Sequence, residues 1–416
     1  MFFFKFQKPG NLEFNMLRRG EIFFASVAEL NDANECRPRF VLNGTTELWR
    51  RLATYILQEA CFRSEVYGRI SREEMCDLFS LSESLGTQLK KWARNRDVGL
   101  EMLDGLFRKL LEEELLKNNP IPLQSRLILD STRRVLRHDL PKAIEEHSYI
   151  ASFSRNAKNA TMWGHYADAE RGFVVVYATE NGTIRIAAPI KMLHRTRPLP
   201  KDRLGDFEIG IYDEDELELK AVKYGKKPPK VNAFHRLIPR FSYSDEEDHY
   251  DVPLLLGGDA KDKEEYGIGL VKFSDWRYEQ EVRAFLPAFN ELPPDMRVMR
   301  AGAANVRGLI FGPRMSERDK MRAVLCCHLM RESSIQSKQE SLQQFMFFQA
   351  LQVVDRFDFR IVPVGILDGI YFDQHLPIKT FDNLDDTTAQ SLRDACHQIG
   401  NSMQDVPTQT NSPSLK

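Results

Sequence analysis

A block of helical sequence interrupts a series of short strand-like runs, and this interruption constrains the fold more than any other feature. Over residues 46–146 apolar side chains recur at i, i+3, i+4 and i+7, a spacing that predicts amphipathic helices. Brief apolar and aromatic runs lie on both sides, such as EIFFA at 21–25 and GFVVVYA at 172–178, and these predict strands. We therefore expect an α+β core at 1–45 and 147–330 with a helical insert at 46–146.

The strand-like runs predict a curved, mixed or antiparallel sheet of about six to eight strands. They are separated by turn residues and lie at 2–6, 21–25, 149–154, 172–178, 182–188, 279–287 and 306–312. The charged, Pro-containing stretch at about 194–270 is expected to form an elaborated loop with one helix.

The C-terminal third is expected to be partly helical. SERDKMRAVLCCHLMRES predicts a helix that begins after residue 314 at a Ser N-cap. A C-terminal extension at 331–398 follows, and RIVPVGIL at 360–367 is its expected last strand. The polar residues 399–416 predict a disordered tail.

The overall charge means that any polyanionic partner would need a local basic patch. Lys and Arg total 58 against 60 for Asp and Glu, so no field of the whole chain attracts nucleic acid or an anionic membrane. The six Cys residues show no CxxC pair and no zinc-ligand spacing with His, which favours reduced thiols and predicts no metal site. The opening MFFFKFQKPG lacks the long apolar run of a signal peptide, and we expect a cytoplasmic protein.

The run KFSDWRYEQEVRAF at 272–285 contains the clearest candidate chemistry. If Tyr278–Phe285 is a strand, side chains alternate and Glu279, Glu281 and Arg283 share one face. Two carboxylates at i, i+2 beside a guanidinium suit charge stabilisation or general acid/base catalysis. The alternative is a solvated strand face that carries an ordinary Glu-Arg pair.

Two further clusters offer candidate binding residues. In MWGHYADAERG at 162–172 a short helix is expected to place Met162, His165 and Tyr166 on one side, with Trp163 rotated away. These side chains either stack on a planar ligand or form an amphipathic cover over the core. In YIASFS, Ser152 and Ser154 alternate with apolar residues and are expected to face one cavity.

The third cluster, SVAELNDANE at 26–35, contains Asn31 and Asp32, which on their own predict only a turn. The chain has no GxGxxG, no Walker loop, no HExxH and no nucleophile elbow. Dinucleotide-binding Rossmann, P-loop, zinc-protease and hydrolase interpretations therefore lack support.

Taken in order, these clusters resemble domain of unknown function family 2971, a bacterial family. Its Asn-Asp-Pro-Phe-Glu, Met-Trp-x-His-Tyr-Ala and Trp-x-Tyr-Glu-x-Glu-x-Arg motifs are similar to NDANE at 31–35, MWGHYA at 162–167 and WRYEQEVR at 276–283. The first motif departs from the family, because Ala33 and Asn34 replace Pro-Phe. The resemblance covers roughly 1–40 and 148–330.

The order of these motifs is also similar to the ADP-ribosyltransferases, above all to toxins of that class that modify DNA. The resemblance implies a split sheet across which NAD lies bent as a substrate. It implies that Glu281 bonds the ribose 2′-OH, that Glu279 orients or deprotonates the acceptor, and that Lys5 takes the early cation position. Exchange of Glu281 for Gln is then expected to abolish NAD turnover with almost no change in melting temperature.

Further roles follow from the same resemblance. His165 or Tyr166 is expected to bond or stack on nicotinamide or its ribose, and Arg283 to hold Glu279 or a pyrophosphate oxygen. The candidates for substrate contact or turn formation are Asn31, Asp32, Trp163 and Tyr278. The protein is then an NAD-consuming toxin or anti-phage defence effector that modifies a nucleic acid or a protein, with a partner protein of a toxin-antitoxin or defence system and no membrane.

Two other functions stay open. A metal-dependent nuclease would use Asp32, Glu279 and Glu281 around Mg²⁺. A non-enzymatic sensor or binding protein would use the motifs only to brace the fold.

Overall fold

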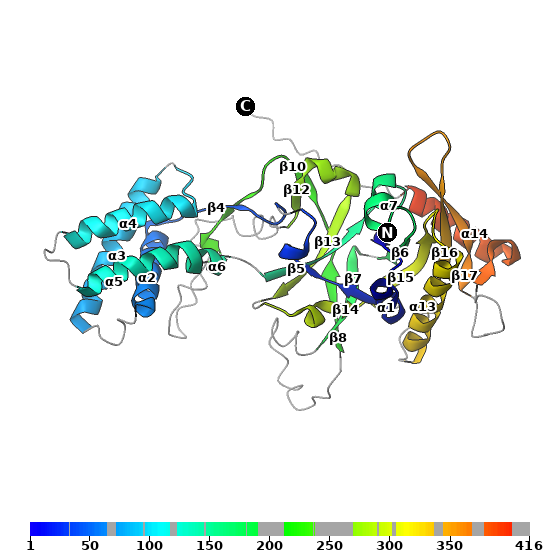
Figure 1. Cartoon of the computed structure of the whole chain (residues 1–416), viewed down its shortest axis with the longest axis horizontal. Helices are drawn as coiled ribbons and strands as arrows, with labels where there is room; N and C mark the ends of the chain where they lie inside the picture. The colour runs from blue at the N-terminus through cyan, green and yellow to red at the C-terminus, as the bar shows by residue number, and fades with distance from the viewer. Residues whose placement is uncertain are drawn as a thin grey trace. The chain divides into compact units, whose positions relative to one another are not determined.

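The computed structural model describes most of the chain. The described residues are 1–32, 34–64, 72–94, 96–116, 123–144, 147–179, 181–189, 212–235, 237, 269–288, 291–301, 305–336, 344–367 and 378–401. The chain divides into two compact units (Figure 1). The first comprises Met1–Glu35, His147–Tyr224 and Lys272–Lys416, and the second comprises Cys36–Glu146 and Gly225–Val271.

Among the described residues, a mixed sheet of ten strands forms the centre of the first unit (Figure 1), so the predicted α+β class and mixed sheet are confirmed, whereas the expected six to eight strands are too few. The strand order is β18-β17-β16-β15-β6-β1-β5-β13-β9, and β3 pairs with β5. β15 and β16 pair in parallel, whereas the neighbouring pairs on both sides are antiparallel. The strands are β1 (Phe2–Gln7), β3 (Ala25–Ser26), β5 (His147–Ser154), β6 (Phe173–Ala178), β9 (Lys220–Ala221), β13 (Glu281–Ala288), β15 (Val306–Phe311), β16 (Met346–Gln352), β17 (Phe359–Leu367) and β18 (Ile378–Thr380).

Pairing within this sheet is weakest between β1 and β5. β1 pairs with β6 over six positions, and β13 pairs with β5 over eight, from Glu281 opposite Ser154 to Ala288 opposite His147. β1 and β5, by contrast, pair only where Phe4 lies opposite Ser154. The sheet therefore divides at this junction.

Alternating side chains of the sheet enter two different cores. Phe3 of β1 packs with α1 (Asn11–Arg19) and α13 (Glu317–Gln336) on one face. Phe4 and Phe6 pack with α7 (Ala160–Tyr166) and α14 (Asp386–Asn401) on the other. β6 is buried on both faces, which explains why its sequence FVVVYA is continuously apolar instead of alternating.

A second sheet covers the α1 side of the first unit. Its order is β2-β14-β7-β8, and its apolar side chains join the same core as Phe3. The strands are β2 (Glu21–Phe23), β14 (Val298–Arg300), β7 (Thr183–Pro189) and β8 (Tyr212–Glu218), and short 3₁₀ turns lie at η1 (Val27–Glu29), η5 (Ser274–Glu279), η6 (Pro294–Arg297) and η7 (Phe381–Asn383).

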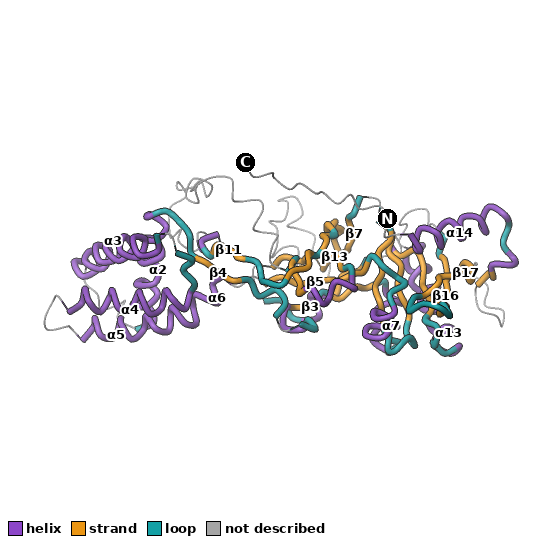
Figure 2. The backbone as a smooth tube through the Cα atoms, turned by 90° about the horizontal axis from the view of Figure 1, so that it is seen from above, coloured by secondary structure: helices purple, strands orange, loops and turns teal. Residues whose placement is uncertain are grey.

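The second unit is mainly helical, and its helices run alongside one another (Figure 2). Trp49, Leu52 and Phe107 belong to its separate apolar core. Its elements are β4 (Arg39–Val41), α2 (Thr46–Arg63), α3 (Arg72–Ala93), α4 (Leu100–Leu116), α5 (Leu123–Arg134), the π-helical turn η3 (Val135–Asp139), α6 (Leu140–Ile144) and β11 (Lys230–Asn232).

The structure differs from the predicted boundaries in three places. Residues 36–45 and 225–237 group with the helical unit, because β4 and β11 pair with each other and Phe234 packs against Trp49. The expected loop at 194–270 contains strands β8, β9, β10 (Lys223–Gly225) and β11 in its described part. The alternation in YDEDELE suits the exposed edge strand β8.

The C-terminal predictions also need correction. RIVPVGIL is not the last strand, because β18 follows it, and 331–398 completes the central sheet instead of forming a separate extension. Residues 399–401 end helix α14, where Ile399 is buried, and the rest of the predicted tail lies outside the described residues. No helix in the described part of the chain is long and apolar enough to cross a membrane.

Candidate functional site

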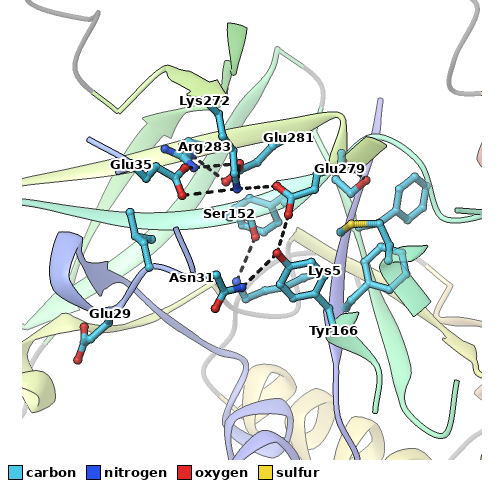
Figure 3. Close-up of a pocket in the computed structure, with 16 residues that line it drawn as sticks. Lys5, Glu29, Asn31, Glu35, Ser152, Tyr166, Lys272, Glu279, Glu281 and Arg283 are labelled. Carbon is cyan, nitrogen blue, oxygen red and sulfur yellow. Dashed lines mark hydrogen bonds and ion pairs between the residues drawn. The ribbon is translucent and has the colours of Figure 1, made fainter. Parts of the chain in front are cut away.

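A cavity of about 200 Å³ lies where the sheet divides between β1 and β5. Its wall includes Phe4, Lys5 and Phe6 from β1 and Ser152 and Ser154 from β5. Residues Glu29–Asn31 and Glu35, helix α7, strand β12 (Val271–Phe273) and the turn before β13 complete it (Figure 3).

Lys272 lies at the centre of a buried cluster of charges in this cavity (Figure 3). Its Nζ donates to Glu279 Oε2 at 2.6 Å and to Glu281 Oε2 at 3.1 Å, and lies 3.5 Å from Glu35 Oε2. Arg283 donates to Glu281 in a bidentate pair, from Nε to Oε1 at 2.7 Å and from Nη2 to Oε2 at 2.9 Å. It also forms an ion pair with Glu35. None of these five side chains is more than 5% exposed.

The carboxylates of Glu279 and Glu281 lie close together because of a turn, and not because they alternate along one strand as predicted. Tyr278 and Glu279 belong to the turn η5, and Gln280 takes the left-handed conformation with φ of 45°, so the strand begins only at Glu281. The prediction of a strand over Tyr278–Phe285 is therefore wrong at its first three residues. The turn folds Glu279 back towards Lys272, and the Ser154 hydroxyl holds it there by donating to the Glu279 carbonyl at 2.7 Å.

Helix α7 places a tyrosine against this cluster. Tyr166 donates its hydroxyl to Glu279 Oε1 at 2.5 Å and accepts a hydrogen bond from Asn31 Nδ2 at 3.1 Å. The helix starts at Asn159, whose side chain caps the Met162 N–H at 3.0 Å. Trp163 anchors the helix in the core through Nε1–H to the Ala157 carbonyl at 2.7 Å.

Lys5 brings a further cation to the opposite wall. Its Nζ donates to the Ser152 carbonyl at 3.1 Å and lies 5.3 Å from the centre of the Phe153 ring. Burial lowers the pKa of Lys5 to about 8, against a weaker opposing effect of Glu281. Lys5 is thus a cation near neutral pH that can lose its proton under mildly alkaline conditions.

Burial and ion pairing oppose each other throughout the site. Burial would lower the pKa of Lys272, but Glu281 and Glu279 raise it above its ordinary value. Burial raises the pKa of Glu281, although Lys272 works against this effect. Three basic side chains, Lys5, Lys272 and Arg283, therefore lie with three acidic ones, Glu35, Glu279 and Glu281, in surroundings of low dielectric.

Most residues that the sequence singles out line this one cavity. They are Lys5, Asn31, Ser152, Ser154, Met162, Tyr166, Glu279, Glu281 and Arg283. Trp163 does not, because its ring is buried in the core, and the Asp32 carboxylate instead accepts the Asn34 N–H at 2.9 Å. His165 does not share the side of Met162, since it is exposed and lies beside Tyr278, with 3.2 Å between Nδ1 and the hydroxyl.

Two residues of the cluster were missed by the sequence analysis. Lys272 opens the KFSDWRYEQE run, but its spacing to the glutamates carries no recognisable signal. Glu35 closes NDANE and matches the Glu of the family motif Asn-Asp-Pro-Phe-Glu, which is the signal that could have identified it. Its pairing with Arg283 joins the first and last motifs in space.

The arrangement does not favour the nuclease interpretation. Asp32 does not line the cavity with Glu279 and Glu281, and the Lys272 ammonium lies between the two glutamates. Within the described ranges no group of three or more His, Cys, Asp or Glu side chains is placed to hold a metal ion.

Comparison with known proteins adds no relative. No family model, no curated protein and no solved structure matches the chain. The resemblances to domain of unknown function family 2971 and to the ADP-ribosyltransferases therefore stay predictions.

Proposed function

We propose that the protein is an NAD-dependent ADP-ribosyltransferase that modifies a macromolecule, as a bacterial toxin or defence effector would. One observation carries the proposal: Glu279, Glu281, Lys5, Ser152 and Tyr166 line one cavity at the division of the sheet. The resemblance to this enzyme class implies an early cation, a serine on a neighbouring strand and a late pair of carboxylates. The same resemblance implies that NAD lies across a split sheet.

The chemistry of NAD cleavage suits this set of groups. The bond between ribose C1′ and the nicotinamide nitrogen breaks, the electron pair leaves with nicotinamide, and positive charge builds on the ribose. Glu281 stabilises that charge and accepts a hydrogen bond from the ribose 2′-OH. The acceptor then bonds to C1′, and its proton passes to Glu279.

The surrounding groups keep the two carboxylates in place. Arg283 and Lys272 fix the Glu281 carboxylate through ion pairs, and Lys272 opposes the rise in the pKa of Glu281 that burial causes. Tyr166 orients the second carboxylate, Glu279, by donating its hydroxyl to Oε1. Such preorganised charges need no reorganisation as the transition state forms.

Transfer of label from NAD tests this function. The purified protein is incubated with NAD labelled in the adenylate half and with cell lysate, and the protein, DNA and RNA fractions are then counted. Label should enter one fraction with the wild type and not with Glu281→Gln, whereas Glu317→Gln, at an 85% exposed glutamate of α13, should behave as wild type. Equal label with the wild type and Glu281→Gln would contradict the proposal.

A further inference from the structure

A second hollow adjoins the first cavity in the same unit. Its volume is about 480 Å³. Phe6, Asn31 and Tyr166 line both spaces, so the two share a wall. The second hollow is also lined by Trp276 and His165, which the proposed chemistry does not use.

Trp276, His165 and Tyr166 line this hollow, and Tyr278, which is not part of its lining, connects Trp276 to His165 in a series of neighbouring rings. The centres of Trp276 and Tyr278 are 6.0 Å apart, those of Tyr278 and His165 are 6.1 Å apart, and those of His165 and Tyr166 are 6.3 Å apart. Lys272 lies 5.1 Å from the Trp276 ring, which links the series to the charge cluster. Partly exposed rings of this kind provide stacking surfaces for a planar ligand.

Polar groups of the hollow suit an amino-substituted ring that carries phosphate. Glu13 lines it, and its Oε2 is buried beside Gly10, which leaves Oε1 to meet a ligand. Lys8 lies 3.5 Å from Glu13 Oε1, and its side chain is 67% exposed. A carboxylate oxygen can accept an exocyclic amine, and an exposed ammonium can turn towards a phosphate.

The volumes of the two spaces indicate that a dinucleotide would need both of them. Small-molecule sites usually measure about 300–1,000 Å³. The first cavity, at about 200 Å³, is below that range and cannot take a whole dinucleotide, whereas the second, at about 480 Å³, lies within it. A dinucleotide that reaches Glu281 with one ribose must therefore place its other half elsewhere.

We propose that the second hollow binds the adenylate half of NAD. Trp276 and His165 stack on the adenine, Glu13 accepts its amino group, and Lys8 faces the phosphates. Tyr166 and Asn31 then lie along the linkage between the two halves. This subsite rests on the proposed function for its ligand, but its rings and polar groups can be tested with a nucleotide that never reaches Glu281.

Calorimetric titration of the full-length protein with AMP tests the subsite. Trp276→Ala should weaken AMP binding about ten-fold or more, because it removes a stacking surface. Trp276→Phe keeps a ring and should retain most of the affinity. Phe357→Ala, at a fully exposed aromatic residue between β16 and β17, is the matched control and should bind AMP as the wild type does.

Nicotinamide release by the same proteins separates the two proposals. Glu281→Gln should bind AMP normally yet release no nicotinamide, which supports both. AMP binding without any release by the wild type would overturn the enzymatic function and leave a purine-nucleotide subsite. Nicotinamide release combined with equal AMP affinity of the wild type and Trp276→Ala, or with no AMP binding at all, would overturn the subsite.

Discussion

Lys272 makes its shortest contact in the buried cluster with Glu279, at 2.6 Å between Nζ and Oε2. The same ammonium reaches Glu281, which lies beyond a left-handed residue in the sequence. Lys272 thus gathers carboxylates from a turn and from a strand into one cavity. The two carboxylates therefore share one cation.

Lys272→Met should lower the free energy of unfolding by about 3–5 kcal/mol, because it leaves buried carboxylates without their shared cation. In the wild type the pKa of Lys272 is raised, so its contribution persists at neutral pH and is lost only when the pH rises above the ordinary lysine range. Burial raises the pKa of Glu281, so in the variant its protonation at lower pH should recover part of the loss.

Urea unfolding at pH 7 and at about pH 5 measures this effect. Lys320→Met is the matched control, because Lys320 pairs with the exposed Glu317 and should cost less than about 1 kcal/mol. Equal losses for the two variants would contradict the role of Lys272.

Lys5→Met should make the unfolding free energy less dependent on alkaline pH. Lys5 has a pKa of about 8 in the folded protein and 10.5 ordinarily, so between these values the unfolded chain binds more protons. The free energy of unfolding of the wild type relative to the variant should therefore rise with pH in that interval, by at most about 1.4 kcal/mol per pH unit. A pH-independent difference in urea unfolding would show that Lys5 does not titrate there.

Tyr166→Phe should separate Glu279 from Asn31. The lost hydroxyl donates to a buried carboxylate, a kind of hydrogen bond that contributes about 1.5–3 kcal/mol. We expect a stability loss of that size and a lower kcat for nicotinamide release. Thermal and urea unfolding measure the stability loss, and Tyr177→Phe, in the core of β6, is the control variant. An undiminished kcat in Tyr166→Phe would exclude a role for Tyr166 in turnover.

Ala169→Gly should stabilise the protein by about 1 kcal/mol. Asp168, Ala169 and Glu170 all have positive φ after helix α7, and Ala169 has φ of 50°. Glycine takes this conformation without steric cost. The opposite sign is expected for Ala389→Gly within α14, by about 1 kcal/mol or more. A loss of stability in Ala169→Gly would show that the left-handed segment is not strained.

Much of the fold could be predicted because it depends on local periodicity. The runs FFFKF and FVVVYA and the helical block produce the expected strands and helices. The joining of β16, β17 and β18 to the central sheet was missed, because pairing between strands distant in sequence leaves no periodic signal. For the same reason β4 and β11 could not be assigned to the helical unit.

The sequence predicted most residues of the candidate site but not their geometry. Alternation places Ser152 and Ser154 correctly, but it assigns Glu279 to a strand although the residue lies in a turn. Gln280 has a left-handed backbone without being glycine, so no residue type marked the break. The ion pairs of Lys272 and Glu35 depend on tertiary contacts, which no spacing in the sequence reveals.

Burial also changes one expectation for Glu281→Gln. Because Glu281 is held by both Arg283 and Lys272, the exchange should lower the melting temperature as well as turnover. A control must therefore disturb the same ion pairs without removing the proposed catalytic carboxylate. Glu35→Gln does so, because Glu35 contacts the same two cations.

Nicotinamide release from NAD by purified wild type, Glu281→Gln and Glu35→Gln is the most direct measurement, made below the melting temperature of all three and with and without lysate. We predict turnover by the wild type, measurable turnover by Glu35→Gln despite its lower stability, and none by Glu281→Gln. No release by the folded wild type under either condition, or release by Glu281→Gln at the wild-type rate, would contradict the proposal that this carboxylate cluster cleaves NAD.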